Sequence, residues 1–275
     1  VIQNTNTKSG DYANLMTVPR PSHSDYPAYV KYNGFNDVRG GGHFSGRLTA
    51  PIVFAGAVAK QILEQNGVKI GAHIRQIGSV FDDKFDYNNV DESLLDELTK
   101  KSFSVINGDA EPKMRDEIER FRMSQDSVGG VIECAAIGLP IGVGGNMFDT
   151  VESKLASILF GVPAVKGVEF GLGFGFADKN ASSVNDGYEI KDGKVALLSN
   201  NNGGVLGGMT TSAPIIVSAV IKPTPSISQE QRSVNLQTMT NETLVIKGRH
   251  DPCIVPRAVP VIEAAVALGL LDLMI

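Results

Sequence analysis

The stretch Gly129-Gly-Val-Ile-Glu-Cys-Ala-Ala-Ile137 is almost continuously apolar. A short apolar run that follows a glycine pair is typical of a largely buried β-strand. Further strands are predicted at 68–80, 165–172, 213–221 and 242–247, with loops rich in Asn and Gly between them. Hairpin-like turns join many of these segments, rather than a strict alternation of strand and helix. The sequence therefore predicts an α+β fold in layers, and not a doubly wound parallel sheet.

Helices are predicted around these strands where apolar residues recur at helical spacing. The predicted helices span 48–65, 91–103, 111–124 and about 258–274. Asp149-Thr-Val-Glu152 resembles a capping box that opens a further helix, and Gly161 and Pro163 suit its end. Residues 1–46 are predicted to be mostly irregular, because Pro, Gly, Asn and Ser punctuate them throughout.

Size and charge limit the class of protein. The 275 residues, 42% hydrophobic and 20% charged, can bury a sizeable core as one large domain or two ordinary ones. The net charge of −5 gives no indication of a nucleic-acid partner, because proteins that bind nucleic acid carry basic faces. The apolar runs are too short or too interrupted to span a bilayer. We therefore expect a soluble protein with neither a nucleic-acid nor a membrane partner.

The two cysteines, Cys134 and Cys253, are far apart in the sequence and lie in apolar surroundings. One disulfide and two buried free thiols both fit this pattern, and free thiols in a reducing compartment are favoured. No cysteine pair has metal-ligand spacing and the four histidines are scattered, so no metal site is predicted. We expect a cytoplasmic protein.

Chemistry-bearing residues gather in two neighbouring stretches, Arg20-Pro-Ser-His-Ser-Asp-Tyr26 and Arg39-Gly-Gly-Gly-His-Phe-Ser-Gly-Arg47. Arginine binds phosphate or carboxylate with a permanent charge, and histidine exchanges a proton near neutral pH. Adjacent glycines let the backbone come close to a ligand and present its N–H groups. Together the two stretches predict an anion site with a titratable group beside it.

Four further clusters have both a functional and a structural interpretation. They are 163–169, the glycine pairs within 202–208, 222–226, and 249–253 with Arg257 one turn on. The glycine pairs are also typical of a hairpin or bulge. Lys222 and the prolines after it are also typical of the end of an edge strand. Arg249 and Asp251 could equally form an ion pair at the start of the last helix. His23 beside Asp25 is also compatible with a satisfied loop histidine, and His73 is predicted to be a core residue. The residues alone predict an enzyme or binder for a phosphorylated or polycarboxylate ligand.

Six stretches together resemble the chorismate synthase family. They are RPSHSDYPAYVKY (20–32), RGGGHFSGR (39–47), PAVKGVE (163–169), NNGGVLGG (201–208), KPTPSI (222–227) and RHDPCIVPRAVPVIEA (249–264). Their order and spacing agree with the family from about Asn4 to the C-terminus.

The resemblance implies the last step of the shikimate pathway. The substrate would be 5-enolpyruvylshikimate 3-phosphate, which loses phosphate by 1,4-anti elimination to give chorismate. Reduced FMN would be the cofactor, and an external source would supply the reduced flavin. The implied fold is a single domain, 1–275, built as a β-α-β sandwich with helices between antiparallel sheet layers. The implied assembly is a homotetramer.

The resemblance also implies roles for particular residues. His23 and Asp251 would be catalytic, His23 by controlling the protonation of reduced FMN and Asp251 by helping to remove the ring proton. Arg20, Arg47 and Arg249 would contact the substrate. FMN would contact His43, Phe44, Ser45, Pro163, Ala164, Gly207, Lys222, Pro223, Thr224, Pro225, Ser226 and Arg249.

The chain departs from the family pattern in three places. His43-Phe-Ser-Gly-Arg47-Leu48 replaces a common Arg-Ser-Ser-Ala-Arg-Glu, so an imidazole stands where a permanent cation is usual. Pro225 stands where Ser is common. The family's N-terminal segment, with its Gly-Glu-Ser-His-Gly motif and a second catalytic histidine, is not in the sequence. We expect ordinary activity if the chain is part of a longer protein. If it is complete, we expect little turnover, and the alternative is an inactive remnant that still binds flavin or phosphate.

Overall fold

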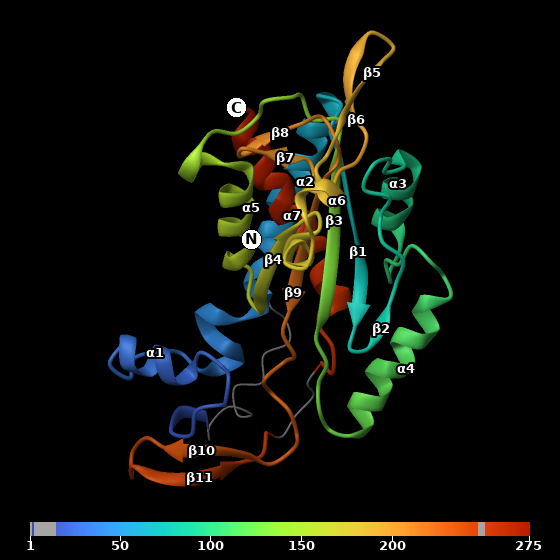
Figure 1. The fold of residues 1–275 in the computed structure, drawn as a ribbon. Coiled ribbons are helices and arrows are strands. Elements are labelled where there is room, and N and C mark those ends of the chain that lie inside the picture. The colour runs from blue at the N-terminus through green and yellow to red at the C-terminus, as the bar shows by residue number, and fades with distance from the viewer. Residues whose placement is uncertain (1, 3–14, 247–250) are drawn as a thin grey trace.

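The structure is a computed structural model that describes residues 2, 15–246 and 251–275 (Figure 1). A five-stranded antiparallel sheet in the order β2-β1-β3-β9-β4 lies at its centre. Its strands are β1 (Lys69–Ile77), β2 (Val80–Phe81), β3 (Gly130–Ile137), β4 (Val165–Phe170) and β9 (Ile215–Ile221). The α+β prediction and the strands predicted at 68–80, 129–137, 165–172 and 213–221 are confirmed.

Strand β3 is apolar at every position except Glu133, because both faces of the sheet are covered. Cys134 and Ala136 belong to the main core on one face, whereas Ala135 packs with Leu95 and Leu98 on the other. Side chains alternate between the two faces of a strand, so a doubly covered strand needs apolar residues at nearly every position.

Helices cover both faces of the sheet. The helices are α1 (Asp25–Lys31), α2 (Thr49–Gln65), α3 (Glu92–Lys100), α4 (Ala110–Met123), α5 (Val151–Gly161), α6 (Ala181–Val184) and α7 (Val255–Met274). Helix α7 packs on the sheet with α2 and α5 beside it, while α3 covers the opposite face (Figure 1). A Cβ at Gly56 of α2 would lie 2.3 Å from the Cβ of Ala264 in α7, so the absence of a side chain at Gly56 lets these two helices touch.

Three local predictions differ in detail from the structure. The capping residue of α5 is Thr150, whose Oγ1 accepts a hydrogen bond from the Ser153 N–H at 2.9 Å, while Asp149 ends a preceding 3₁₀ turn. The segment 1–46 contains helix α1, which the prolines and serines around it concealed. The last strand, predicted at 242–247, is β11 (Thr240–Leu244), paired with β10 (Gln231–Asn235).

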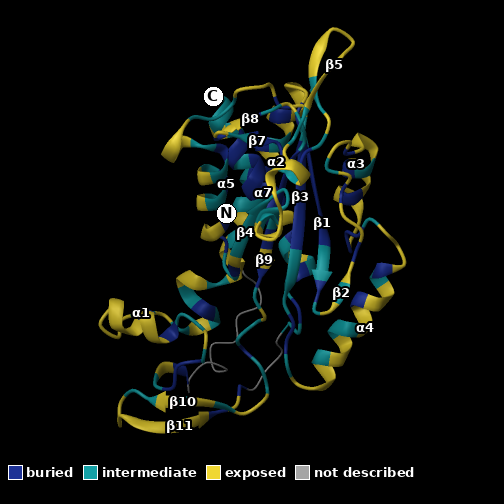
Figure 2. Cartoon of the chain, in the orientation of Figure 1, coloured by how far each residue is buried: buried dark blue, intermediate teal, exposed yellow. Residues whose placement is uncertain are grey.

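Two more hairpins extend from the body. β5 (Tyr188–Lys191) pairs only with β6 (Lys194–Leu197), and β7 (Val205–Leu206) pairs with β8 (Met209–Thr210). The β5–β6 hairpin projects from one end of the molecule and is largely exposed (Figure 2).

His73 is a core residue, as predicted, but it is held by two buried carboxylates. Its Nδ1 lies 3.0 Å from Asp82 Oδ2 and its Nε2 lies 3.1 Å from Glu133 Oε2. A carboxylate can only accept, so an imidazole between two of them donates from both nitrogens and is positively charged. Burial alone would lower the pKa of His73, but its hydrogen bonds to Asp82 and Glu133 raise the pKa above its ordinary value.

Both cysteines are buried free thiols, which confirms the favoured interpretation. Burial raises the pKa of the Cys134 thiol well above its ordinary range. Among the helices that the structure describes, none combines the length and apolar character needed to cross a membrane.

Candidate active site

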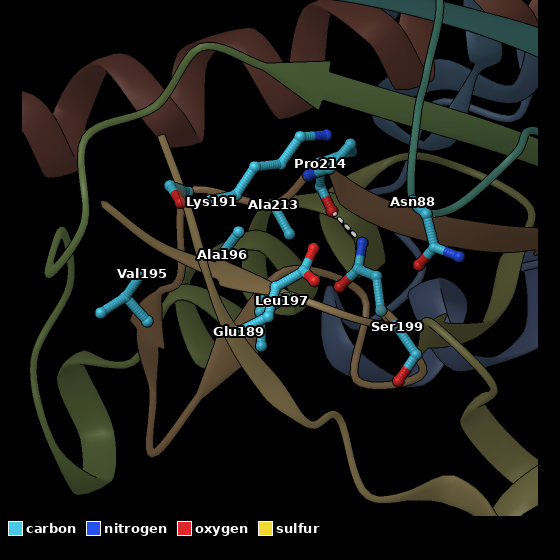
Figure 3. Close-up of a pocket in the computed structure, with 11 residues that line it drawn as sticks. Asn88, Glu189, Lys191, Val195, Ala196, Leu197, Ser199, Ala213 and Pro214 are labelled. Carbon is cyan, nitrogen blue, oxygen red and sulfur yellow. Dashed lines mark hydrogen bonds between the residues drawn. The ribbon is translucent and has the colours of Figure 1, made fainter. Parts of the chain in front are cut away.

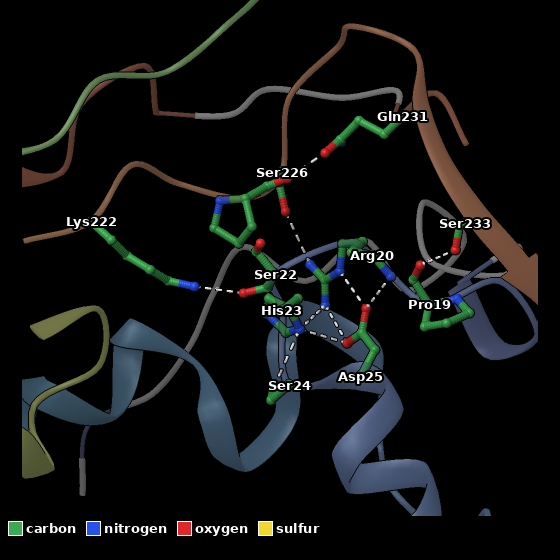
Figure 4. A network of polar contacts seen from close by, with 11 residues as sticks. Pro19, Arg20, Ser22, His23, Ser24, Asp25, Lys222, Ser226, Gln231 and Ser233 are labelled. Carbon is green, nitrogen blue, oxygen red and sulfur yellow. Dashed lines mark hydrogen bonds and ion pairs between the residues drawn. The ribbon is translucent and has the colours of Figure 1, made fainter. Parts of the chain in front are cut away.

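Several residues selected from the sequence meet where strand β9 ends. The loop Lys222–Ser226 follows β9 and reaches the segment before α1 (Figure 4). Lys222 Nζ donates a hydrogen bond to the carbonyl oxygen of Ser22, and Arg20 Nη1 donates to Ser226 Oγ at 3.2 Å. The partners are 200 and 206 positions apart in the chain, so only the tertiary fold brings them together.

Asp25 is the centre of the polar network in Figure 4. Its Oδ2 accepts from Arg20 Nε at 2.7 Å and from the Arg20 backbone N–H at 3.0 Å. Its Oδ1 accepts from Arg20 Nη2 at 2.9 Å and lies 2.6 Å from His23 Nδ1. Burial alone would raise the pKa of the Asp25 carboxyl, but the hydrogen bonds from Arg20 and His23 hold the pKa well below its ordinary value. Asp25 is therefore a buried, ionised acceptor.

Arg20 is placed differently from the expectation of a substrate contact. Its side chain is only 6% exposed, and its guanidinium fork is occupied by the two oxygens of Asp25. A bidentate contact uses the geometry that would otherwise bind a phosphate or carboxylate of the substrate. In this arrangement Arg20 is a supporting residue that holds Asp25 in place.

The glycine run lies against His23. Gly40, Gly41 and Gly42 all have positive φ, of 59°, 87° and 52°, which only glycine adopts readily. A Cβ at Gly41 would lie 3.7 Å from His23 Nε2, so the bare backbone at this position faces that nitrogen.

The same run borders an open pocket of about 540 Å³. The pocket is lined by Arg39, Gly40, Gly42, Ser45, Arg47 and residues at the start of α2. Arg47 is exposed, and its Nη1 donates to the Gly40 carbonyl oxygen at 3.0 Å. Of the predicted contacts on this loop, Ser45 and Arg47 line the pocket, whereas His43 and Phe44 are exposed and are not among its lining residues.

The loop after β9 brings further predicted residues to the site. The Lys222 N–H donates to the Ala164 carbonyl oxygen at 2.9 Å, which places Pro163 and Ala164 beside it. Burial lowers the pKa of Lys222, and the neighbouring Lys166 lowers it further. Thr224 Oγ1 is buried and has no hydrogen-bond partner among the described residues. Buried hydroxyls are normally paired, so this group points to a missing partner.

Two predicted residues, Gly207 and Asp251, make no direct contact with this network. Gly207 and Gly208 form the turn between β7 and β8. The Gly208 carbonyl oxygen accepts a hydrogen bond from the Val151 N–H at the start of α5, whereas Ala164 comes after the end of that helix. Helix α5 has 11 residues and is about 16 Å long, so Gly207 is remote from Lys222 within this chain. Asp251 pairs with Arg257 at 2.8 Å. Arg249 lies outside the described residues.

Asp251 and the loop after β9 are nevertheless linked through a single segment of the chain between them. Pro252 accepts a hydrogen bond from the Val128 N–H at 2.8 Å, and Ser127 Oγ donates to the Thr224 carbonyl oxygen at 2.7 Å. The segment 127–128 therefore separates Asp251 from Thr224.

A second pocket, of about 270 Å³, lies at the base of the β5–β6 hairpin (Figure 3). Two of its polar groups are already paired: Ser199 Oγ donates to Asp186 at 2.6 Å, and Asn200 Nδ2 donates to the Pro214 carbonyl oxygen at 2.8 Å. None of the predicted site residues lines it. The candidate active site is therefore the network of Figure 4 and the adjoining glycine loop.

Sequence reasoning gave no role to Ser22 or Ser127, and it considered Asp25 only as the neighbour of His23. Only Asp25 carries a local signal, because an acidic residue stands two positions after a histidine and five after an arginine. Ser22 acts through its backbone carbonyl, and Ser127 through a bond to a residue 97 positions away, neither of which a local pattern reveals.

The sequence of this chain is similar to those of known proteins over nearly its whole length. A family profile described as chorismate synthase matches residues 1–275. The chain belongs to the chorismate synthase family. The chorismate synthase of Thermococcus kodakarensis is 47% identical over 272 residues, which cover 99% of this chain and 74% of that protein. The chorismate synthase of Pyrococcus abyssi is 48% identical over 273 residues, with the same coverage.

A solved chorismate synthase has the same fold. The crystal structure titled as that of chorismate synthase superposes with a TM-score of 0.74 at 29% identity, covering 90% of this chain and 69% of that one. Chorismate synthases are carbon–oxygen lyases of the shikimate pathway, and this chain is such a lyase.

Proposed function

We propose that this chorismate synthase eliminates phosphate from 5-enolpyruvylshikimate 3-phosphate in a 1,4-anti reaction that depends on reduced FMN. The observation that carries the proposal is His23, which is fixed at Nδ1 by Asp25 and faces the bare Gly41 backbone at Nε2. A histidine that is held by a carboxylate at Nδ1 and makes no hydrogen bond to a described residue at Nε2 suits proton transfer near neutral pH. Arg47 and Lys222 supply nearby positive charge for an anionic ligand.

The described residues fit a phosphorylated flavin at this place. The unpartnered Thr224 hydroxyl can bind a polar ligand atom, and the pocket beside the glycine run offers the polar side chains of Arg39, Ser45 and Arg47. When bound, reduced FMN would supply electron density to the departing phosphate. The proposed flavin contacts are His43, Phe44, Ser45, Pro163, Ala164, Lys222–Ser226, Arg249 and, from further away, Gly207.

The protein's own residues then divide the remaining tasks. His23 would hold or release a proton at Nε2, and Arg47 and Arg249 would bind substrate anions. Asp251 would help to remove the ring proton. Its Oδ2 is bound to Arg257, which leaves Oδ1 for that step. Arg20 would act through Asp25.

The proposal predicts a stoichiometric anaerobic reaction. Protein whose full length is confirmed by intact mass is mixed with substrate and reduced FMN, and phosphate release and chorismate absorbance are followed together. We expect equal amounts of both products, and none with oxidised FMN as the control. Tight flavin binding without phosphate release would favour the inactive remnant instead.

We propose a cytoplasmic homotetramer that receives reduced flavin from an external source. The β5–β6 hairpin supports the assembly, because Tyr188, Ile190 and Val195 share one face of it and are 60–73% exposed. An isolated two-stranded hairpin with an uncovered apolar face is marginally stable in water. A second copy of the chain would cover that face.

Substitutions in the β5–β6 hairpin test the proposed tetramer. Ile190→Lys is expected to reduce the sedimentation coefficient by splitting the tetramer, whereas Lys194→Glu, on the opposite face, is expected to leave it unchanged. An intact tetramer in the Ile190→Lys protein would exclude this hairpin from the interface.

A further inference from the structure

Three polar groups crowd around His23 Nδ1, and only one of them is a hydrogen-bond acceptor of full strength. Asp25 Oδ1 lies 2.6 Å away, Arg20 Nη2 3.1 Å away and Ser24 Oγ 3.4 Å away. An arginine nitrogen can only donate, and an ionised carboxylate can only accept. One ring nitrogen cannot donate to Asp25 and accept from Arg20 at the same time, so the partners compete for the state of Nδ1.

Distance and charge decide this competition in favour of Asp25. The contact to Asp25 is the shortest of the three, as expected for a charge-assisted hydrogen bond. Arg20 Nη2 already has an acceptor in the same Oδ1 atom at 2.9 Å and needs nothing from the imidazole. Nδ1 therefore carries a proton and donates it to Asp25. In the neutral imidazole the lone pair is then on Nε2, the atom nearest to Gly41.

We propose that Asp25 is a positioning residue, which holds His23 in the Nδ1–H tautomer with Nε2 directed at the glycine loop, while Arg20 holds Asp25. The catalytic consequence rests on the proposed role of His23 in proton transfer. The tautomer itself does not depend on that role.

The consequence of Asp25→Asn follows from the same geometry. The asparagine amide has a single oxygen. That oxygen takes the place of Oδ2, because two donors of Arg20, Nε and the backbone N–H, already point at this position. The amide nitrogen then occupies the present position of Oδ1, opposite Nδ1. Arg20 Nη2 loses its acceptor there and is left with Nδ1, which lies 3.1 Å from it in the wild type. An NH₂ group there can only donate, so Nδ1 becomes the acceptor and the proton moves to Nε2. The variant reverses the tautomer and leaves the ring in place.

The tautomer can be measured directly by nitrogen NMR of protein labelled with ¹⁵N-histidine, without cofactor, at a pH where His23 is neutral. The His23 signals are assigned with a His23→Gln protein. In the wild type we expect a protonated Nδ1 and an unprotonated Nε2, and in Asp25→Asn the reverse. Asp37→Asn is the matched control, because Asp37 forms an exposed bidentate pair with Arg39, and it should leave the His23 signals unchanged. A wild-type spectrum with the proton on Nε2 overturns the proposal whether or not the variant folds.

Turnover shows whether Asp25 acts through His23. Asp25→Asn is expected to lower kcat by about 10²-fold or more, with a much smaller change in KM, and Asp25→Glu is expected to restore part of the loss. The double variant His23→Ala/Asp25→Asn should be no slower than His23→Ala alone, because residues that act as a unit are not additive. A further drop in the double variant would contradict positioning through His23. If His23→Ala keeps wild-type turnover, the proposed function of His23 fails, and the NMR result still decides the tautomer.

Discussion

Replacing His23 by alanine is expected to reduce kcat by about 10²- to 10⁴-fold, the usual contribution of a general acid or base. The side chain is fixed by Asp25 at 2.6 Å, and its other nitrogen faces the glycine loop. Removing the imidazole takes away the proton carrier and leaves the Arg20–Asp25 pair intact. The fold and the affinity for FMN should therefore change little.

Two measurements separate loss of chemistry from loss of binding. Anaerobic single-turnover kinetics report the chemical step, and flavin fluorescence titration reports FMN affinity. Ser24→Ala is a suitable control, since its hydroxyl is 3.4 Å from Nδ1 and makes the weakest contact there. Wild-type turnover in the His23→Ala protein would remove His23 from the mechanism.

The largest effect on stability is expected for His73→Leu, at about 3–5 kcal/mol of unfolding free energy near neutral pH. Leucine fills the volume of the imidazole but leaves Asp82 and Glu133 without the cation between them. Both carboxylates keep other donors, from the Ile106 and Asn107 N–H groups and from Phe85 N–H and the Tyr87 hydroxyl. Hydrogen bonds alone do not balance two buried negative charges.

The pH dependence of this effect has a definite sign. The raised pKa of His73 means that its stabilisation is complete below its ordinary value of about 6.5 and is lost as the pH rises through the raised value. The pKa values of Asp82 and Glu133 are lowered against the effect of burial by their hydrogen bonds, above all to His73. Their stabilisation is present above their ordinary values and is lost as the pH falls through the lowered ones.

Urea unfolding of four proteins tests this coupling. They are the wild type, His73→Leu, Glu133→Gln and the double variant. His73→Leu should cost less in the Glu133→Gln background, because one of the two stranded charges is then absent. If His73→Leu lowers the free energy of unfolding by the same amount in both backgrounds, the ion pair between His73 and Glu133 contributes nothing beyond packing.

Helices and strands could be predicted from the sequence wherever burial of one face gives the apolar residues a regular spacing. Strand β3 and helix α2 are apolar at the positions that face the core, so their sequences alone indicate their structure. Helix α1 was missed because its only buried residues are Asp25 and Ala28, and a helix with so little apolar surface carries no periodic signal. The start of α5 was misplaced by one residue because Asp149 and Thr150 are both good capping residues, and packing of the preceding turn selects between them.

The sequence by itself determined the family, the α+β class and the types of residue that the site contains. Those properties depend on side-chain chemistry and on spacing within a few residues. Only the tertiary structure decided which charges pair and which remain available. Arg20 and Arg47 are chemically identical, yet one is buried with its fork filled by Asp25 while the other lines a pocket. The difference arises because burial removes water from Arg20 and makes a carboxylate partner necessary, and the tertiary fold that buries Arg20 also brings it to Ser226, 206 positions away.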